Sequence, residues 1–260
     1  MPLTIFQQGV ARLLSAGRTE DSYLAGGAAL HIAPNSLRYS NDLDYFNDSA
    51  ERVASAFATD ERVLLQADYH LHVTLDRPGF VRALVSKGGD STKVEWVHDT
   101  AWRFLPVVVH ELAGYCLHPL DLAVNKVLAL VGRDEPRDYL DTLDVHEHIL
   151  ELGALVWAAA GKDPGFTPTM LLGLLRRRGR YHAEDFQRLH LSRAPDLGEL
   201  KVKWLEALEQ AEQFVTARPF EEVGCLYYSP SLQRFAHQHG EADDWVPHYG
   251  RPGGVLPLVG

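Results

Sequence analysis

The spacing of apolar and polar residues predicts two helices in the N-terminal part of the chain. The first is expected over residues 3–16, where apolar side chains recur at helical spacing. Those side chains are Phe6, Val10, Leu13 and Leu14. Ser49, with Asp48 before it and Glu51 close behind, is typical of a helix N-terminus, and we expect this second helix to run to about residue 58.

A series of β-like segments follows the second helix. They are residues 62–65, 69–74, 80–86 and 91–97. The sequence Lys87-Gly88-Gly89-Asp90 separates the last two segments, and paired glycines between apolar runs are a strong hairpin signal. We therefore expect a β-hairpin here, in addition to an earlier strand that carries Asp42 and Asp44.

Helical patterns dominate after residue 117. Pro119 suits the first turn of a helix whose apolar stripe consists of Leu120, Val124, Val127 and Val131. Further helices are predicted over residues 168–178 and 197–217, with breaks at 161–165 and 192–195, whereas the tail from residue 218 shows no clear period. The chain is therefore predicted to be α+β, with a sheet-containing core over residues 1–117 and a mainly α-helical region over residues 118–260.

Composition is that of a globular protein without a general affinity for nucleic acid. The chain has 260 residues, of which 46% are hydrophobic, and this is enough for a large buried core. Its net charge of −10 argues against a protein that coats nucleic acid through a basic surface. The local basic run Arg176-Arg177-Arg178-Gly179-Arg180 is either an RNA-backbone or acidic-partner contact, or a solvated helix end.

The sequence also bears on the cellular compartment. Cys116 and Cys225 are the two cysteines, and we expect both to be free thiols. No segment approaches the length of a membrane span, and the first residues lack the basic and then apolar layout of a secretory signal. We expect a cytoplasmic protein that has no membrane partner.

The candidate chemistry begins with paired glycines and paired aspartates. Asp42 and Asp44 sit at strand spacing, so their carboxylates share one face roughly 6.6 Å apart along the strand. Such oxygen ligands suit Mg²⁺ or Mn²⁺, which often bind phosphates as well. Gly26 and Gly27 precede a helix-like segment, where backbone N–H groups can face an anion. Alone, either pair is commonly just a solvated turn.

Taken together, these residues resemble the opening motif of the nucleotidyltransferases of the AbiEii/AbiGii abortive-infection toxin family. The motif reads Gly26-Gly27-Ala28-Ala29-Leu30, then Arg38-Tyr39-Ser40-Asn41-Asp42-Leu43-Asp44-Tyr45. Two later segments match the same family, Lys126-Val127-Leu128-Ala129 with Arg133, and Arg137-Asp138-Tyr139-Leu140-Asp141. The resemblance covers about residues 20–145, and its specificity lies in the ordered set. It implies a fold similar to DNA polymerase β, with a mixed sheet flanked by helices.

The resemblance implies roles for individual residues. Asp42 and Asp44 would bind the metal, and Glu95, which shares a strand face with Lys93, is the candidate third metal ligand. Asp99 or Glu111 could take that place instead, and Glu95 could simply pair with Lys93 or a cross-strand base at the surface. The groups expected to bind the nucleotide are Gly26, Gly27, Arg38, Ser40, Lys126, Arg133, Arg137, Asp138 and Asp141.

Two of these assignments have simpler alternatives, and one position departs from the family pattern. Lys126 is assigned to the triphosphate, although a solvent-exposed lysine is the competing interpretation. Arg137 and Asp141 could form a helical i,i+4 pair. Ala28 stands where the family usually carries Ser or Thr, so a hydroxyl that could bond a phosphate oxygen is missing.

The resulting hypothesis is a metal-dependent nucleotidyltransferase that takes a nucleoside triphosphate as substrate. The resemblance implies a toxin with RNA, such as tRNA, or protein as the acceptor and a separately encoded antitoxin as partner. One alternative is a catalytically weak nucleotide-binding or interaction protein on the same fold. Another is a metal-independent ribonuclease of the HEPN type, because Arg177 and His182 match its spacing, although Gly179 interrupts the required helix. Zinc binding by His70 and His72, or by the pair at 146 and 148, is less favoured.

Overall fold

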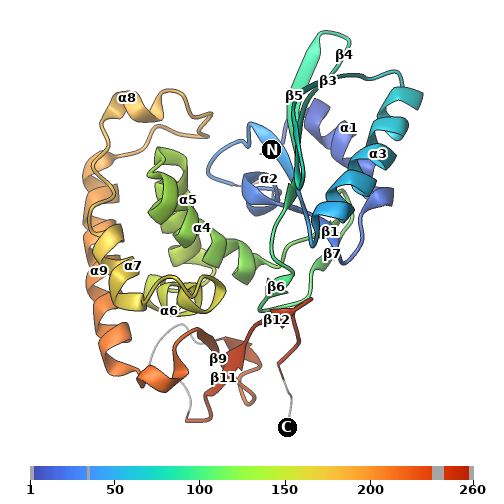
Figure 1. Cartoon of the computed structure of the whole chain (residues 1–260). Coiled ribbons are helices and arrows are strands. Elements are labelled where there is room, and N and C mark those ends of the chain that lie inside the picture. The colour runs from blue at the N-terminus through green and yellow to red at the C-terminus, as the bar shows by residue number, and fades with distance from the viewer. Residues whose placement is uncertain (1–2, 34–35, 236–242, 258–260) are drawn as a thin grey trace. The chain divides into compact units, whose positions relative to one another are not determined.

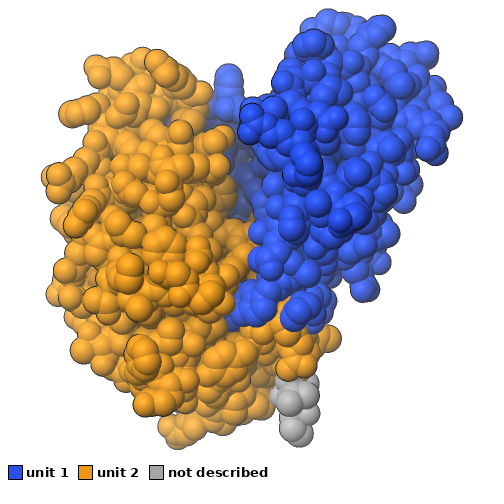
Figure 2. Space-filling view, viewed as in Figure 1, with its two compact units in different colours: residues 1–118, 190–192, 252–254 blue, residues 119–189, 193–251, 255–260 orange. Residues whose placement is uncertain are grey.

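The computed structural model describes residues 3–33, 36–235 and 243–257. The chain divides into two compact units (Figure 2). Unit 1 contains residues 1–118, 190–192 and 252–254, and unit 2 contains residues 119–189, 193–251 and 255–260. Each unit is described by itself.

Unit 1 is built on a seven-stranded mixed sheet with the order β3-β4-β5-β2-β1-β8-β7 (Figure 1). Its strands are β1 (Ser22–Ala25), β2 (Asp42–Asn47), β3 (His70–Arg77), β4 (Phe80–Lys87), β5 (Asp90–His98), β7 (Val108–His110) and β8 (Gly114–Cys116). β2 pairs with β5 in parallel, β1 pairs with β8 in parallel, and the other pairings are antiparallel. The helical elements of unit 1 are α1 (Ile5–Leu14), η1 (Ser15–Gly17), α2 (Gly26–Leu30) and α3 (Ala50–Gln66).

Helices α1 and α3 lie on one side of this sheet, as Figure 1 shows. The first begins with a capping box in which the Thr4 hydroxyl accepts from the Gln7 N–H and the Gln7 side chain accepts from the Thr4 N–H. Between helix and sheet, the Arg18 guanidinium donates to both carboxylate oxygens of Asp60, and the Trp96 indole donates to Asp60 at 2.7 Å. Asp60 is 1% exposed, so this network fixes α3 against the sheet from inside the core.

The structure confirms the predicted hairpin and corrects one predicted strand. Gly88 and Gly89, at φ +62° and +94°, form the β4–β5 turn. Residues 62–65, predicted as a strand, instead belong to α3, which continues past residue 58 to Gln66. The buried stripe Val53, Ala56, Asp60 and Leu64 keeps helical spacing through this segment, and the apolar run at 63–65 is therefore part of a helix face.

Unit 2 is mainly helical. Its helices are α4 (Pro119–Arg133), α5 (Pro136–His148), α6 (Leu152–Lys162), α7 (Pro168–Leu175), α8 (Ala183–Phe186) and α9 (Leu197–Ala217). α6 is buried along residues 152–160, so it forms the centre of the helical core. α4 begins at Pro119 as predicted, and its stripe Leu120, Val124, Val127 and Val131 is buried.

The tail from residue 218, which shows no clear apolar period, contains strands. After η2 (Phe220–Glu222), β9 (Cys225–Ser229) pairs with both β10 (Arg234–Phe235) and β11 (Val246–Tyr249). All five residues of β9 are buried, which explains why no alternation marks it. The short strands β6 (Trp102–Arg103) and β12 (Arg251–Pro252) complete the elements, and the Gly253 N–H donates to the Ala101 carbonyl within unit 1.

The predicted fold class is confirmed, because the chain is α+β with a mixed sheet flanked by helices. Within the described residues, none of the helices combines the length and the apolar character that crossing a bilayer requires. Cys116 and Cys225 are both buried free thiols, and burial raises the pKa of the Cys116 thiol to about 12.

Candidate active site

Three carboxylates meet on one face of the sheet in unit 1. The parallel register of β2 and β5 sets Asp44 beside Glu95 and Asp42 beside Lys93. Because alternate residues of a strand share a face, the three acids project together. One carboxylate oxygen from each of Asp42, Asp44 and Glu95 lies within 4.8 Å of the others. The register therefore joins residues that are distant in sequence into one acidic cluster.

The residues between these acids anchor both strands in the core. Leu43 and Tyr45 of β2, like Val94 and Trp96 of β5, are fully buried on the opposite face. The Phe57 ring of α3 packs edge-on against Trp96, with ring centroids 5.0 Å apart. Each strand therefore has one face packed against α3 and one face that carries the acidic cluster.

The glycine turn lies against this cluster. Gly26 has φ +60°, and a Cβ built on it would lie only 2.1 Å from Asp44 Oδ2. A Cβ on Gly27 would lie 2.9 Å from Arg38 Nη2 and 3.2 Å from Ser40 Oγ. These approaches leave no room for a side chain, which explains in physical terms why two glycines occur here. The turn brings backbone next to the carboxylates at the start of α2, which has no side-chain N-cap.

Arg38 and Ser40 support the start of β2. The Ser40 hydroxyl donates to the Asp42 carbonyl at 3.0 Å, and the Gln7 amide donates to the Ser40 carbonyl at 3.0 Å. The Arg38 guanidinium donates to the Tyr39 carbonyl at 3.1 Å. Arg38 and Ser40 are 4% and 3% exposed, so in this structure both hold the backbone beside the acidic cluster.

Lys93 is a neighbour of the acidic cluster, and it pairs with two of its carboxylates. Its ammonium lies 2.7 Å from Asp42 Oδ2 and 3.0 Å from Glu95 Oε1, while Arg82 Nε lies 2.7 Å from the same Glu95 oxygen. Burial acts to lower the pKa of Lys93, but its hydrogen bonds to Asp42 and Glu95 outweigh burial and raise that pKa. Two cations therefore partly neutralise the acidic cluster.

The donor set fits a hard divalent cation. Within the described part of the chain, these three acids form the group close enough to bind one ion, and neither Asp99 nor Glu111 belongs to it. All donors are carboxylate oxygens, with no histidine or cysteine among them. Oxygen-only sets suit Mg²⁺ or Mn²⁺ rather than zinc.

The remaining predicted residues form a second polar group, on α4 and α5 of unit 2. The Lys126 ammonium lies 2.6 Å from Asp141 Oδ2 and 3.3 Å from Asp138 Oδ1, and Arg133 Nε lies 2.5 Å from Asp138 Oδ2. Lys126 is 5% exposed and both aspartates are fully buried, so Lys126 is not a solvent-exposed lysine. Burial acts to raise the pKa of Asp138, but the Arg133 hydrogen bond and the Lys126 charge lower it.

Arg137 and Ala28 are the two predicted positions that remain. Asp141 contacts Lys126 at 2.6 Å, whereas no ion pair between Arg137 and Asp141 is found among the described residues. The Arg137 Nε is buried without a hydrogen-bond partner in that part of the chain. Ala28 is fully buried in α2, so its methyl group packs into the core of unit 1.

Among the residues that the structure describes, the less favoured motifs do not assemble into sites. α7 ends at Leu175, Gly179 has φ +78°, and His182 caps α8, so Arg177 and His182 do not share a helix. His70 and His72 are exposed on β3.

Comparisons with known proteins bear on the fold. JHP933 from Helicobacter pylori is similar to this chain with a TM-score of 0.52 and 16% identity, over 81% of this chain and 91% of that chain. MenT4, a nucleotidyltransferase toxin from Mycobacterium tuberculosis H37Rv, is similar with a TM-score of 0.50 and 16% identity, over 84% of each chain. At this identity the likeness concerns the fold, which is therefore similar to that of nucleotidyltransferase structures. No protein-family model and no curated protein matches the sequence significantly.

Proposed function

We propose that this chain is a metal-dependent nucleotidyltransferase that moves a nucleoside monophosphate from a nucleoside triphosphate to an acceptor hydroxyl. The observation that carries the proposal is the cluster of Asp42, Asp44 and Glu95, whose oxygens lie within 4.8 Å of one another. The glycine turn touches the same cluster at Asp44. A carboxylate cluster beside a glycine turn is suited to hold a metal-bound triphosphate.

The chain's own residues would contribute binding and orientation. Asp42, Asp44 and Glu95 would hold Mg²⁺ or Mn²⁺, and Gly26 and Gly27 would let phosphate oxygens approach the backbone. When bound, the divalent cations neutralise phosphate charge and lower the pKa of the acceptor hydroxyl. The acceptor hydroxyl would give its proton to solvent as its oxygen bonds to the α-phosphorus. The bond between the α-phosphorus and the oxygen that bridges to the β-phosphate would break, and pyrophosphate would leave with that oxygen. Most of the rate enhancement would come from positioning and electrostatics.

We assign the second polar group to the triphosphate on the strength of the sequence resemblance. Lys126 and Arg137 would bind phosphate oxygens, and Asp138 and Asp141 would hold the lysine. Arg133 would act through its ion pair with Asp138. Arg137 is partly buried and forms no ion pair among the described residues, so its guanidinium is available to a phosphate.

The biological role that we propose is that of a toxin in an abortive-infection or toxin–antitoxin system. The motifs shared with the AbiEii/AbiGii family and the fold similarity to MenT4, itself described as a nucleotidyltransferase toxin, support this proposal. The acceptor would be RNA, such as tRNA, or a protein, and an antitoxin would be the protein partner.

Two observations favour the alternative of a nucleotide-binding protein with weak catalysis. Lys93 and Arg82 already neutralise part of the acidic cluster. Ala28 also lacks the hydroxyl that the family pattern offers to a phosphate. Magnesium-dependent nucleotide binding without any transferred label would support this alternative.

The test is a transfer assay with matched variants. The protein is incubated with each α-labelled nucleoside triphosphate, Mg²⁺ and total cellular RNA, and RNA and protein products are resolved on a gel. We expect Asp42→Asn and Asp44→Asn to abolish labelling while their thermal unfolding stays cooperative. Asp76→Asn, which changes an exposed acid on β3 of the same sheet, should keep full activity. Undiminished labelling by either cluster variant would overturn the assignment.

A further inference from the structure

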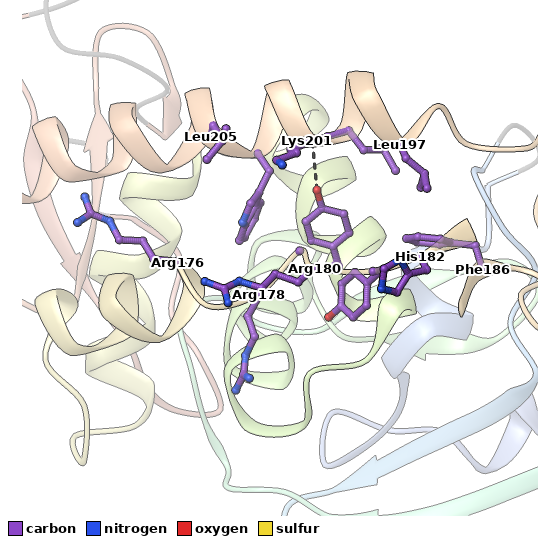
Figure 3. Close-up of a pocket in the computed structure, with 13 residues that line it drawn as sticks. Arg176, Arg178, Arg180, His182, Phe186, Leu197, Lys201 and Leu205 are labelled. Carbon is purple, nitrogen blue, oxygen red and sulfur yellow. Dashed lines mark hydrogen bonds between the residues drawn. The ribbon is translucent and has the colours of Figure 1, made fainter. Parts of the chain in front are cut away.

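Unit 2 contains a cavity of about 530 Å³ that the proposed transfer reaction does not use. It lies between the first turns of α9 and the segment at residues 176–186, and all the residues that line it belong to unit 2 (Figure 3). Its volume is in the range of small-molecule sites.

The charge of this cavity is opposite to that of the chain. The protein carries a net charge of −10, yet the ionisable side chains of the lining are three arginines, one lysine, one histidine and two tyrosines, with no carboxylate. Arg176 is paired with Glu212, and Arg178 is paired with Asp134 at 2.9 Å. Arg180 and Lys201 are exposed and have no ion pair within the described residues. Figure 3 shows them on opposite walls, Lys201 on α9 and Arg180 on the loop. An uncompensated pair of cations in a concave site favours an anion.

Aromatic residues form the apolar wall of the cavity. Tyr139 packs edge-on against Trp204, with ring centroids 5.1 Å apart, and Tyr181 lies 5.3 Å from Tyr139 and 5.8 Å from Phe186. Leu197, Leu200 and Leu205 of α9 extend this surface. The wall is suited to a flat, apolar group rather than to a bare inorganic ion.

A buried donor faces this region without a partner. Trp204 is 3% exposed, and its indole Nε1 has no hydrogen-bond partner in the described part of the chain. Gly179, at φ +78°, lies over it, because a Cβ there would be 3.2 Å from Nε1 and 2.9 Å from the Tyr139 ring. Glycine therefore keeps side-chain atoms away from the indole edge. Buried donors are rarely left unpaired, so an acceptor supplied by a ligand is the consistent partner.

We propose that this cavity binds a nucleotide unit, with the phosphate between Arg180 and Lys201 and the base against the aromatic wall near Trp204. The two cations supply charge-assisted hydrogen bonds to the phosphate. Aromatic rings stack with any base, so the wall does not select one base over another. A free mononucleotide and one unit of a single RNA strand share this chemistry. The site lies outside the acidic cluster, since its residues belong to unit 2 and those of the cluster to unit 1.

The experiment measures binding without the proposed catalytic metal. The Asp42→Asn protein in EDTA is titrated with AMP by calorimetry and with a fluorescein-labelled 12-nucleotide RNA by polarisation. Arg180→Gln and Lys201→Gln are made in this background, because both side chains are exposed and neither change should affect folding. Arg177→Gln is the matched control, since it removes an exposed charge from the same basic run outside the cavity lining. Trp204→Phe removes the indole donor and keeps an aromatic ring.

We expect Arg180→Gln and Lys201→Gln each to weaken binding about tenfold, as for the loss of a charge-assisted hydrogen bond, and Arg177→Gln to change it less than about twofold. Weakened AMP binding identifies a mononucleotide as the ligand, whereas an effect on RNA alone identifies a strand. Trp204→Phe should weaken the binding of the same ligand. The proposal is overturned if neither probe binds, if Arg177→Gln weakens binding as much, or if inorganic phosphate binds as tightly as AMP.

Discussion

The ammonium of Lys93, which lies on the same strand as Glu95, is 2.7 Å from Oδ2 of Asp42 on the neighbouring strand. The same nitrogen is 3.0 Å from Glu95 Oε1, so one cation bridges two of the three clustered carboxylates. Like-charged carboxylates this close repel each other, and the bridge relieves that repulsion. A divalent cation that binds the same oxygens must compete with Lys93.

Replacing this lysine should therefore strengthen metal binding. We expect Lys93→Met to lower the dissociation constant for Mn²⁺ by about tenfold, because a competing positive charge is removed. The same change should lower the melting temperature of the metal-free protein, since the cluster keeps the Arg82 cation but loses the ammonium that bridges Asp42 and Glu95. Titration calorimetry with Mn²⁺ and thermal unfolding in EDTA measure the two effects.

Arg77→Met is the matched control for this charge change. Arg77 is exposed on the edge strand β3, two strands away from β5. Its loss should alter Mn²⁺ affinity less than about twofold, because exposed charges are well screened. Mn²⁺ binding to Lys93→Met that is equal to or weaker than binding to the unmodified protein would contradict the competition.

The glycine turn makes a second prediction. Gly26→Ala places a Cβ 2.1 Å from Asp44 Oδ2 on a residue with φ +60°, so the turn or the carboxylate must move. We expect about 1–3 kcal/mol of destabilisation and at least a tenfold weaker affinity for Mn²⁺. Gly132→Ala on α4, where a Cβ meets nothing within 4 Å, should be neutral or stabilising by up to about 1 kcal/mol. Similar Mn²⁺ affinities in the two variants would show that the glycine turn does not support metal binding by the cluster.

Local patterns predicted much of this fold, and tertiary packing decided the rest. The β4–β5 turn follows from Gly88 and Gly89, whose left-handed backbone angles are a property of the turn itself. The segment at residues 62–65 has the composition of a strand, yet it belongs to α3 because its Leu64 continues a buried helical stripe. The strand β9 was missed because burial on both faces removes alternation.

The members of the acidic cluster could be predicted from the sequence because a local pattern, the alternation of side chains along a strand, relates them. Alternation put Asp42 and Asp44 on one face, and Glu95 on the same face as Lys93, so only the strand pairing was unknown. The cavity in unit 2 could not be predicted in this way. It joins Tyr139, Arg180 and Trp204 from three segments, and no short-range pattern relates them.

The buried group on α4 and α5 predicts a large stability effect. Lys126→Met leaves Asp141 without its 2.6 Å contact to the ammonium, and both Asp138 and Asp141 are fully buried. Removing one partner of such a group costs about 3–5 kcal/mol. Lys203→Met, which breaks exposed or half-exposed pairs with Glu147 and Glu199, should cost less than about 1 kcal/mol. Urea unfolding of both variants measures the difference, and equal costs would show that Lys126 does not stabilise the helices.

The α5–α6 junction makes the stability of unit 2 depend on pH. His146 Nδ1 accepts the Leu152 N–H at 3.0 Å, so this nitrogen must be unprotonated in the folded chain. Burial lowers the pKa of His146, and the Glu147 charge offsets this only in part. The pKa of His146 is therefore lower in the folded state than in the unfolded state. The stabilisation is fully present above the unfolded-state pKa of about 6.5, and it is lost as the pH falls through the folded-state pKa.

His146→Gln should therefore reduce the loss of stability between pH 7 and pH 5, because the residue no longer gains a proton on unfolding. The measurement is the melting temperature at half-unit pH steps, compared as a difference from the unmodified protein. That difference isolates His146 from His118, whose pKa burial lowers to about 4. His148→Gln, at an exposed histidine paired with Asp144, is the control and should not flatten the curve. If His146→Gln leaves the slope unchanged, the Leu152 hydrogen bond does not control it.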